Sequence, residues 1–236
     1  MIRGRNMSNI AIIPARSGSK GLKDKNIKDL NGIPLIAYSI KCALDSGMFD
    51  CVFVSTDSIE YAKIAEEYGA NANFLRSEKN SSDKAGSWDV VREVLEQFEK
   101  EGQVFDKIML LQPTSPLRTV EDIRSSFEMM RTKSANAIVS VAEMEHSPLW
   151  CNVLPDDLSM EKFYNDMAIN MPRQELPKYY RLNGAIYLLK KQELQKVKMF
   201  REKCYAYIMP IDRSIDIDTE FDFKMAQILL NQGKGK

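Results

Sequence analysis

The chain is poor in the residues that several common kinds of chemistry need. Its only histidine is His146, which excludes a site built from several histidines, and a Ser-His-Asp triad would depend on that residue alone. The four cysteines, Cys42, Cys51, Cys151 and Cys204, show neither a CxxC pair nor the spacing of metal ligands. We expect them to be reduced thiols in the core, because a chain of this size does not need disulfides. Any catalysis must therefore rest on Asp, Arg, Lys and amide groups.

An excess of charge and long apolar runs are also missing. Lys and Arg number 33 and Asp and Glu number 33, which excludes the strongly basic surface of a nucleic-acid or anionic-membrane binder. The first apolar run stops after Ile13, too early for a signal peptide, and no stretch approaches the length of a membrane span. We expect a cytoplasmic protein with neither nucleic acid nor membrane as a partner, and its natural start could be Met7.

What the chain does contain is an alternation of short apolar runs with segments of helical spacing. Its 236 residues with 44% hydrophobic content can bury one sizeable core. We expect helices over residues 35–44, 59–68, 90–98, 119–130 and 219–230, and extended segments over residues 10–14, 51–55, 73–75, 107–111, 137–141, 185–189, 205–209 and 215–218. This alternation predicts a three-layer α/β domain with a mainly parallel sheet.

Local signals mark the ends of several helices. Pro34 is placed where the first residue of a helix is expected. Two pairs, Thr119 with Asp122 and Thr219 with Asp222, have the spacing of a capping box. These signals predict where three of the helices begin.

The alternation fails between about residues 143 and 181, where prolines and mixed charge replace the apolar periods. We interpret this segment as an arm outside the sheet. The chain is then a single domain over residues 1–236 with an inserted arm at 143–181.

The loop after the first strand, residues 16–26, combines glycine with positive charge. Gly18 and Gly21 let backbone amides approach an anion, and Arg16, Lys20 and Lys25 supply charge suited to a triphosphate. The loop has neither the GK[ST] of a Walker A motif nor the three glycines of GxGxxG. A phosphate cradle and a flexible solvated loop are both open at this point.

A second candidate lies near the C-terminus. If the segment is extended, Asp216 and Asp218 share one face and Ile215 and Ile217 the other. Two carboxylates on one face can share Mg²⁺, with water and substrate phosphate completing its shell. The alternative is that Asp218 and Thr219 cap the last helix and Asp216 is solvated.

Two weaker candidates remain. Gln112 begins a polar loop, stiffened by two prolines, at the end of a buried strand, and it can offer a ligand both a donor and an acceptor. A rigid turn explains the same loop. Arg173, Gln174, Arg181 and Asn183 gather near the end of the arm, where arginine could bind a carboxylate or belong to a solvated face.

Taken together, the motifs resemble the CMP-sialic acid synthetases, the acylneuraminate cytidylyltransferases. They occur in the order of that family across nearly the whole chain. The matching segments are IPARSGSKGL at 13–22, KN at 25–26, STD at 55–57, LQPTSPLR at 111–118, PRQELP at 172–177, NGAIY at 183–187 and IDIDTE at 215–220.

The resemblance implies a Rossmann-like nucleotidyltransferase domain whose arm reaches across a homodimer. It assigns residues to three ligands. The residues implied to bind the nucleotide are Arg16, Gly18, Ser19, Lys20, Gly21, Lys25, Asn26, Arg76 and Ser82. Those implied to bind the sugar are Gln112, Arg173, Arg181, Asn183 and Tyr187. Asp216 and Asp218 are implied to bind Mg²⁺. The residues implied in catalysis are Arg16, Lys25, Asp216 and Asp218.

The implied reaction transfers CMP from CTP to the anomeric hydroxyl of a nine-carbon sialic-acid-like sugar, with loss of pyrophosphate. The general base is open between a water on the metal and one of the aspartates. The acceptor could instead be legionaminic or pseudaminic acid, or a shorter octulosonic acid. In a different class, DID at 216–218 could be the DxD motif of a glycosyltransferase, or the chain could bind a nucleotide without turnover.

Overall fold

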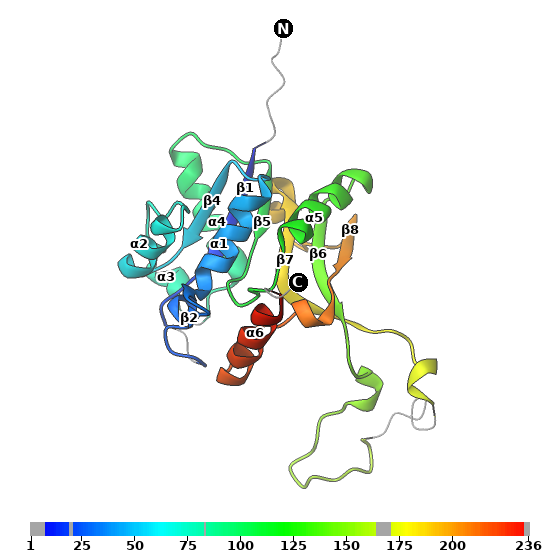
Figure 1. Cartoon of the computed structure of the whole chain (residues 1–236). Coiled ribbons are helices and arrows are strands. Elements are labelled where there is room, and N and C mark those ends of the chain that lie inside the picture. Colours follow the sequence, from blue (N-terminus) through cyan, green and yellow to red (C-terminus); the bar gives the residue numbers. More distant parts are fainter. Residues whose placement is uncertain (1–7, 19–20, 83, 164–170, 234–236) are drawn as a thin grey trace.

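The computed structural model describes residues 8–18, 21–82, 84–163 and 171–233. Within them, six strands form one sheet in the order β4-β1-β5-β7-β6-β8 (Figure 1). The strands are β1 (Asn9–Pro14), β4 (Cys51–Ser55), β5 (Lys107–Leu110), β6 (Ala137–Glu143), β7 (Tyr180–Lys190) and β8 (Cys204–Ile208). Only the two pairings of β7 are antiparallel. The predicted α/β domain with a mainly parallel sheet is confirmed.

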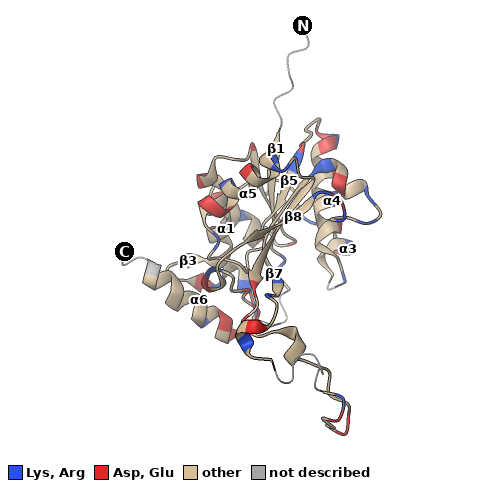
Figure 2. Ribbon diagram, turned by 90° about the vertical axis from the view of Figure 1, so that its right-hand side faces the viewer, with Lys and Arg blue, Asp and Glu red and all other residues tan. Residues whose placement is uncertain are grey.

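Helices cover both faces of this sheet, as Figure 2 shows with α1 and α5 on one side and α4 on the other. The helices are α1 (Leu35–Ser46), α2 (Ile59–Glu67), α3 (Glu78–Ser81), α4 (Ser87–Lys100), α5 (Val120–Thr132) and α6 (Glu220–Gly233). Shorter elements are β2 (Asp29–Leu30), β3 (Ile33–Pro34) and the 3₁₀ turns η1 (Lys25–Ile27), η2 (Pro148–Trp150), η3 (Arg173–Glu175), η4 (Lys191–Gln195) and η5 (Ile211–Arg213). Among the described residues, no helix combines the length and the apolar character that crossing a bilayer requires.

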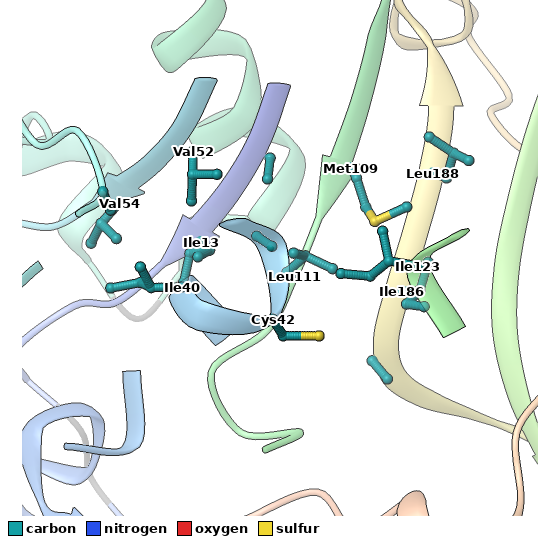
Figure 3. Packing of buried hydrophobic residues seen from close by; sticks show 14 of the residues in the cluster. Ile13, Ile40, Cys42, Val52, Val54, Met109, Leu111, Ile123, Ile186 and Leu188 are labelled. Atoms are coloured by element: carbon teal, nitrogen blue, oxygen red, sulfur yellow. The ribbon is translucent and has the colours of Figure 1, made fainter. Parts of the chain in front are cut away.

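Strand periodicity divides the core into two layers. Along β1, Ala11 and Ile13 face α1, where Ile13 packs in one cluster with Ile40 (Figure 3). Ile10 and Ile12 point the other way, into the cluster under α4. All four β1 side chains are fully buried. Burial of each isoleucine contributes about 1.5–3 kcal/mol, which fixes the register of the central strand.

The predicted capping boxes are both present. In α5 the Asp122 carboxylate accepts from the backbone N–H of Thr119 at 2.8 Å, and the Thr119 hydroxyl accepts from the N–H of Asp122 at 3.3 Å. Thr219 and Asp222 repeat the exchange in α6 at 2.8 and 3.3 Å. Pro34, however, ends β3 and is the N-cap residue one position before α1, because it pairs with Asp29 and its ψ of 142° is extended rather than helical.

The strand predicted over residues 73–75 is not formed, and that prediction was wrong. A single parallel bridge joins Phe53 to Asn71 instead. Phe74 then turns into the core and stacks on Phe53 with ring centroids 4.4 Å apart. Aromatic packing therefore takes the place of strand pairing here.

Residues 215–218 are likewise not a strand of the sheet. Their main anchor is the backbone N–H of Ile217, which donates to the Thr114 carbonyl at 2.9 Å. Ile217 itself is fully buried beside Phe223 of α6. The segment is a loop held by this bond, by the bond from Lys25 to the Ile217 carbonyl and by the buried Ile217 side chain, and its two aspartates remain on the solvent side.

The four cysteines are free thiols, as expected. Cys42 and Cys51 are buried, but Cys151 is exposed and Cys204 is partly exposed. Their placement in the core was therefore wrong for the last two. Cys151 lies just after η2, outside the sheet and its covering helices.

Strand pairing extends into both ends of the predicted arm, since Glu143 pairs with Tyr180. The described residues between these ends, 145–163 and 171–178, extend away from the sheet in Figure 1. Its described residues include η2 and η3 and several exposed apolar side chains, among them Val153, Leu154, Leu158 and Met160.

One buried cation joins the sheet to its helices. Arg118 is 5% exposed and donates to the carbonyls of Ala185 and Gln112, both at 2.8 Å, and to the Ser39 hydroxyl at 3.2 Å. Burial lowers the pKa of Arg118, an effect that the nearby Cys42 and Asp122 oppose. The guanidinium therefore links β7, α1 and the loop after β5.

Replacing this cation should cost stability. We expect Arg118→Ala to lower the free energy of unfolding by about 3 kcal/mol or more, because three buried acceptors lose their donor. Arg124 of α5 donates to the carbonyls of Ser46 and Asp45 but is exposed, so Arg124→Ala should cost less than about 1 kcal/mol. Urea unfolding of both variants measures the difference, and equal losses would contradict the proposed role of Arg118.

Candidate active site

The loops at one edge of the sheet enclose a cleft of about 540 Å³. Because β1, β5 and β8 run parallel, their carboxyl ends meet there, together with the amino end of antiparallel β7. Nine of the residues predicted from the sequence line the cleft. They are Arg16, Gly21, Lys25, Asn26, Arg76, Ser82, Gln112, Asp216 and Asp218.

Other predicted residues lie away from this cleft. Arg173 lines a separate hollow of about 300 Å³ at the base of the arm and donates to the Glu145 carbonyl at 2.5 Å. Gly18 is an exposed residue of the loop and Arg181 donates to the Ser214 carbonyl at 3.0 Å. Ser19 and Lys20 lie outside the described residues.

Two residues predicted for the sugar are held by the protein itself. Asn183 is buried, and its amide donates to the Ser214 hydroxyl at 2.9 Å and accepts from the Ser140 hydroxyl at 2.6 Å. Tyr187 is partly buried and packs edge-on against Trp88 with ring centroids 5.8 Å apart. Neither belongs to the lining of the cleft.

Lys25 connects the first loop of the site to the last. Its ammonium donates to the Ile217 carbonyl at 2.5 Å and to the Asp218 carboxylate at 3.0 Å, 193 residues away in the sequence. The side chain of Lys25 is 11% exposed and that of Asp218 is 74% exposed. A nearly buried ammonium thus points at a carboxylate that stays open to solvent.

Gly21 lies against the same segment. A β-carbon built on Gly21 would stand 2.6 Å from the Asp218 carbonyl oxygen, which is closer than real side chains approach a backbone oxygen. Only glycine lets the two loops come this close.

The two sides of the first loop are tied down by other residues. Asp57, which follows β4, accepts from the backbone N–H and the hydroxyl of Ser17 at 2.8 and 3.1 Å. On the far side, the Tyr61 hydroxyl of α2 donates to Asp24 at 3.1 Å. The described parts of the loop are therefore fixed to the sheet at its start and to α2 near its end.

Asp216 and Asp218 both face the cleft. Partial desolvation raises the pKa of Asp216, and the negative charge of Asp218 adds to the rise. A hydrogen bond with Thr114 and the positive charges of Lys25 and Arg181 oppose it but do not cancel it. The pair is thus short of positive charge, which a cation would supply.

The donor set suits a hard divalent cation that keeps several other ligands. Two neighbouring carboxylates line the cleft, and the described residues contain no group of three or more His, Cys, Asp and Glu that could enclose a metal. Mg²⁺ is commonly bound by one or two carboxylates with water and substrate phosphates. The residues present therefore fit Mg²⁺ as a partner of a phosphate ligand, but not a closed metal site.

Other residues of the lining carry groups that suit a nucleotide. Arg76 donates to the hydroxyl and the carbonyl of Ser55 at 3.0 and 2.5 Å, and burial lowers its pKa to about 10, so it keeps its charge at neutral pH. The amide of Asn26 donates to the Arg16 carbonyl at 3.0 Å. The Ser82 hydroxyl donates to the Lys79 carbonyl at 3.0 Å and also lines the cleft.

Gln112 is fixed from behind by its backbone. Its carbonyl accepts from Arg118, while its side-chain oxygen lies against Gly184, where any β-carbon would collide with it. Gly184 has a φ of +74°, a left-handed conformation that favours glycine. The same β-carbon would stand 3.7 Å from Asp216, so Gly184 leaves room for Gln112 and Asp216 together.

Sequence reasoning missed several residues of the lining. Thr114 interacts with the Asp216 carboxyl and lines the cleft. Its position two residues after Gln112 in a polar loop is a signal that could have found it. Asn80 of α3 and Ser87 of α4 also line the cleft, but nothing in their local sequence marks them.

Comparison with known proteins identifies the family of the chain. The family model described as cytidylyltransferase matches residues 10–234. The CMP-N,N'-diacetyllegionaminic acid synthase of Legionella pneumophila is 36% identical over 94% of this chain and 95% of that protein. The N-acylneuraminate cytidylyltransferase of Streptococcus agalactiae is 39% identical over 92% of this chain, which spans about half (52%) of that protein.

A solved structure shows the same fold. The CMP:2-keto-3-deoxy-manno-octonic acid synthetase complexed with CTP superposes with a TM-score of 0.71 over 96% of this chain and 99% of that one, at 19% identity. This likeness confirms the Rossmann-like nucleotidyltransferase fold. Together with the family model and the full-length relative, the arrangement of the cleft places the chain in a single family: it belongs to the cytidylyltransferases that include the CMP-sialic acid synthetases.

Proposed function

We propose that the protein transfers CMP from CTP to the anomeric hydroxyl of a nine-carbon sialic-acid-like sugar and releases pyrophosphate. The observation that carries the proposal is the single cleft in which Arg16, Lys25 and Arg76 face Asp216 and Asp218. Cations suit a triphosphate, and an acidic pair suits the metal that accompanies it. The similarity to cytidylyltransferases supports CTP as the nucleotide.

In this proposal the chain acts by positioning and by neutralising charge. Arg16 and Lys25 bind the phosphates, with Ser19 and Lys20 as predicted partners outside the described residues. Arg76, Ser82 and Asn26 hold the rest of the nucleotide, and the sugar hydroxyl attacks the α-phosphorus in line as pyrophosphate leaves. Lys25 is already held by Ile217 and Asp218, so little reorganisation is needed at the moment of reaction.

We propose Asp216 and Asp218 as the residues that hold Mg²⁺. When bound, Mg²⁺ would neutralise phosphate charge and favour departure of pyrophosphate. One of the two carboxylates is also the candidate acceptor of the proton lost by the sugar hydroxyl.

For the sugar, we propose Gln112 as a direct contact because it lines the cleft. Asn183 and Tyr187 are proposed to shape the pocket from behind, since the bonds of Asn183 are made within the protein. Arg173 and Arg181 remain proposed partners of the sugar carboxylate. The acid itself stays open between sialic, legionaminic and pseudaminic acids, because one added group changes affinity by only about 1–3 kcal/mol.

We further propose that the protein acts as a homodimer in the cytoplasm. The arm exposes Val153 by 87% and Leu158 by 69%, and apolar side chains gathered on one protruding segment are typical of an interface. In this proposal the arm reaches across the dimer, so that Arg173 would serve the sugar pocket of the second copy.

The proposed reaction is tested by pyrophosphate release from CTP and Mg²⁺ with a panel of sialic, legionaminic, pseudaminic and octulosonic acids. We expect release with a nine-carbon acid and a product of the mass of its CMP derivative. Asp216→Ala and Asp218→Ala should each lower the rate at least about 100-fold, while Asp45→Ala, at an exposed position of α1, should not. If the folded protein released no pyrophosphate with any acid, a glycosyltransferase or a binding module would replace this proposal.

The contact between the first and last loops gives a second prediction. Gly21→Ala should raise the KM for CTP roughly ten-fold, because its methyl group forces the loop away from Asp218 at a cost of about 1–3 kcal/mol. Gly18→Ala adds the same methyl where no atom lies within 4 Å, so its effect should be clearly smaller. Initial-rate kinetics of the two variants measure the contrast, and equal effects would mean that the Gly21 contact is unimportant.

The third prediction concerns stability. Because the pKa of Asp216 is higher in the folded state than in the unfolded state, its ionised form opposes folding at pH values above the folded pKa, and the penalty disappears below the unfolded pKa. At neutral pH and without metal, Asp216→Asn should therefore raise the Tm. Mg²⁺ should raise the Tm of the wild type but not of Asp216→Asn. A lower Tm for the metal-free variant would contradict this prediction.

A further inference from the structure

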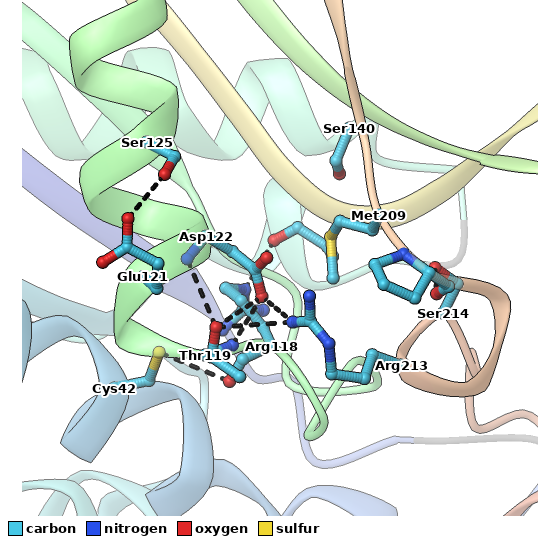
Figure 4. Close-up of polar contacts among 12 residues, drawn as sticks. Cys42, Arg118, Thr119, Glu121, Asp122, Ser125, Ser140, Met209, Arg213 and Ser214 are labelled. Carbon is cyan, nitrogen blue, oxygen red and sulfur yellow. Dashed lines mark hydrogen bonds and ion pairs between the residues drawn. The ribbon is translucent and has the colours of Figure 1, made fainter.

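A buried polar network lies behind the loop that carries the two cleft aspartates. Its centre is the carboxylate of Asp122, which is 1% exposed (Figure 4). One oxygen accepts from the backbone N–H and the hydroxyl of Thr119, both at 2.8 Å, and from the guanidinium of Arg213. The other oxygen accepts from the Tyr207 hydroxyl at 3.0 Å. The network therefore joins the first turn of α5 to β8 and to η5.

Neither Asp122 nor Arg213 lines the cleft, but Arg213 leads directly into the loop that does. Ser214 follows it and is held by Asn183 at 2.9 Å and by Arg181 at 3.0 Å. Asp216 comes two residues later. The start of this loop, residues 213–218, which we call the aspartate loop, is thus fixed by an ion pair to α5 and by hydrogen bonds to β7.

The far end of the same loop is fixed separately. The Ile217 N–H donates to Thr114 and its carbonyl accepts from Lys25. The loop between Arg213 and Ile217 is short, so a displacement of the backbone at either end also displaces Asp216. The polar anchors at the Ile217 end, Thr114 and Lys25, themselves line the cleft, whereas Asp122 and Arg213 do not.

The Asp122–Arg213 pair is ionised. Burial alone would raise the pKa of Asp122, but hydrogen bonds from Arg213 and Thr119 hold it below its ordinary value. For Arg213, burial works toward a lower pKa and the bond to Asp122 outweighs it. The Asp122 side chain is buried, whereas that of Arg213 is 31% exposed. Loss of Arg213 is therefore the costly break, because it leaves a buried carboxylate without its charged partner.

We propose that Arg213, through its ion pair with Asp122, is a positioning residue that sets where Asp216 and Asp218 meet the divalent cation. This inference rests on the proposed function, since it assumes that the two aspartates bind the metal. Residues that orient metal ligands from behind typically change metal affinity or activity about 10- to 100-fold when they are replaced.

The test is a titration of the full chain, without nucleotide, with MnCl₂ followed by the EPR signal of the free ion. We expect Arg213→Ala to weaken Mn²⁺ binding about 10- to 100-fold, and to raise the half-saturating Mg²⁺ concentration for pyrophosphate release by a similar factor. The KM for CTP should change less, because the cations that bind the nucleotide stay in place. Arg213→Lys, which keeps the charge, should restore part of the affinity.

Arg131→Ala is the matched control. Arg131 is on the same helix as Asp122 and pairs with Glu128 at 2.5 Å, but both side chains are exposed and distant from η5 in sequence. It should leave Mn²⁺ binding unchanged. Both variants lose an arginine–carboxylate pair of α5. A difference in their Mn²⁺ affinity is therefore due to where the pair lies, and not to the loss of an ion pair as such.

Three outcomes are informative. If the wild type and Arg213→Ala bind Mn²⁺ equally well, the positioning role is overturned and the proposed function stands. If the wild type binds no Mn²⁺, the metal site fails and the positioning role with it. If Arg213→Ala does not fold, Arg213→Gln replaces it, since it keeps a neutral donor for Asp122; affinity equal to that of the wild type would again overturn the proposal.

Discussion

The site depends on the hydrogen bonds that the Lys25 ammonium group donates. This group joins η1, which follows the first strand, to the loop before the last helix, through the Ile217 carbonyl and the Asp218 carboxylate. A cleft built this way exists only when both ends of the domain have folded onto the same edge of the sheet. Glycine at position 21 lets the loops touch, and the lysine charge balances one of the two aspartates that the contact brings into the cleft. The contact of Lys25 with Ile217 and Asp218 therefore determines both the shape of the site and its charge balance.

Behind the cleft, residues at the start of α5 position two of the loops that form it. Arg118, just before the helix, fixes the backbone of Gln112, and Asp122, within its first turn, fixes Arg213 at the start of the aspartate loop. Each group is buried, so its hydrogen bonds are expensive to leave unmade and define one arrangement of the chain. A capping box places Asp122 correctly, because Thr119 holds the carboxylate from the helix side. A local helix signal thus contributes to the geometry of a site made from distant loops.

The sequence predicted the sheet, five of the helices and both capping boxes, because apolar periodicity and caps are local signals. It failed at residues 73–75, where Phe74 packs on a ring brought close only by folding. Most cleft residues were found because they follow strands and occur in recognisable motifs. Asn80 and Ser87 were missed because their place in the cleft depends on how α3 and α4 pack. Arg213 was missed for the same reason. Its partner Asp122 lies 91 residues earlier, and no local sequence pattern at either residue predicts their ion pair.

Two aspartates close to the site show how one residue type serves two purposes. Asp122 is buried, yet Arg213, Thr119 and Tyr207 all donate to it, and the balance of these effects lowers its pKa. Asp216 has only a hydroxyl of Thr114 and the distant charges of Lys25 and Arg181 against partial desolvation and a neighbouring carboxylate, and its pKa is raised. The first carboxylate is satisfied by the protein and stabilises the fold. The second is left short of positive charge, which is the condition expected of a carboxylate that binds a cation.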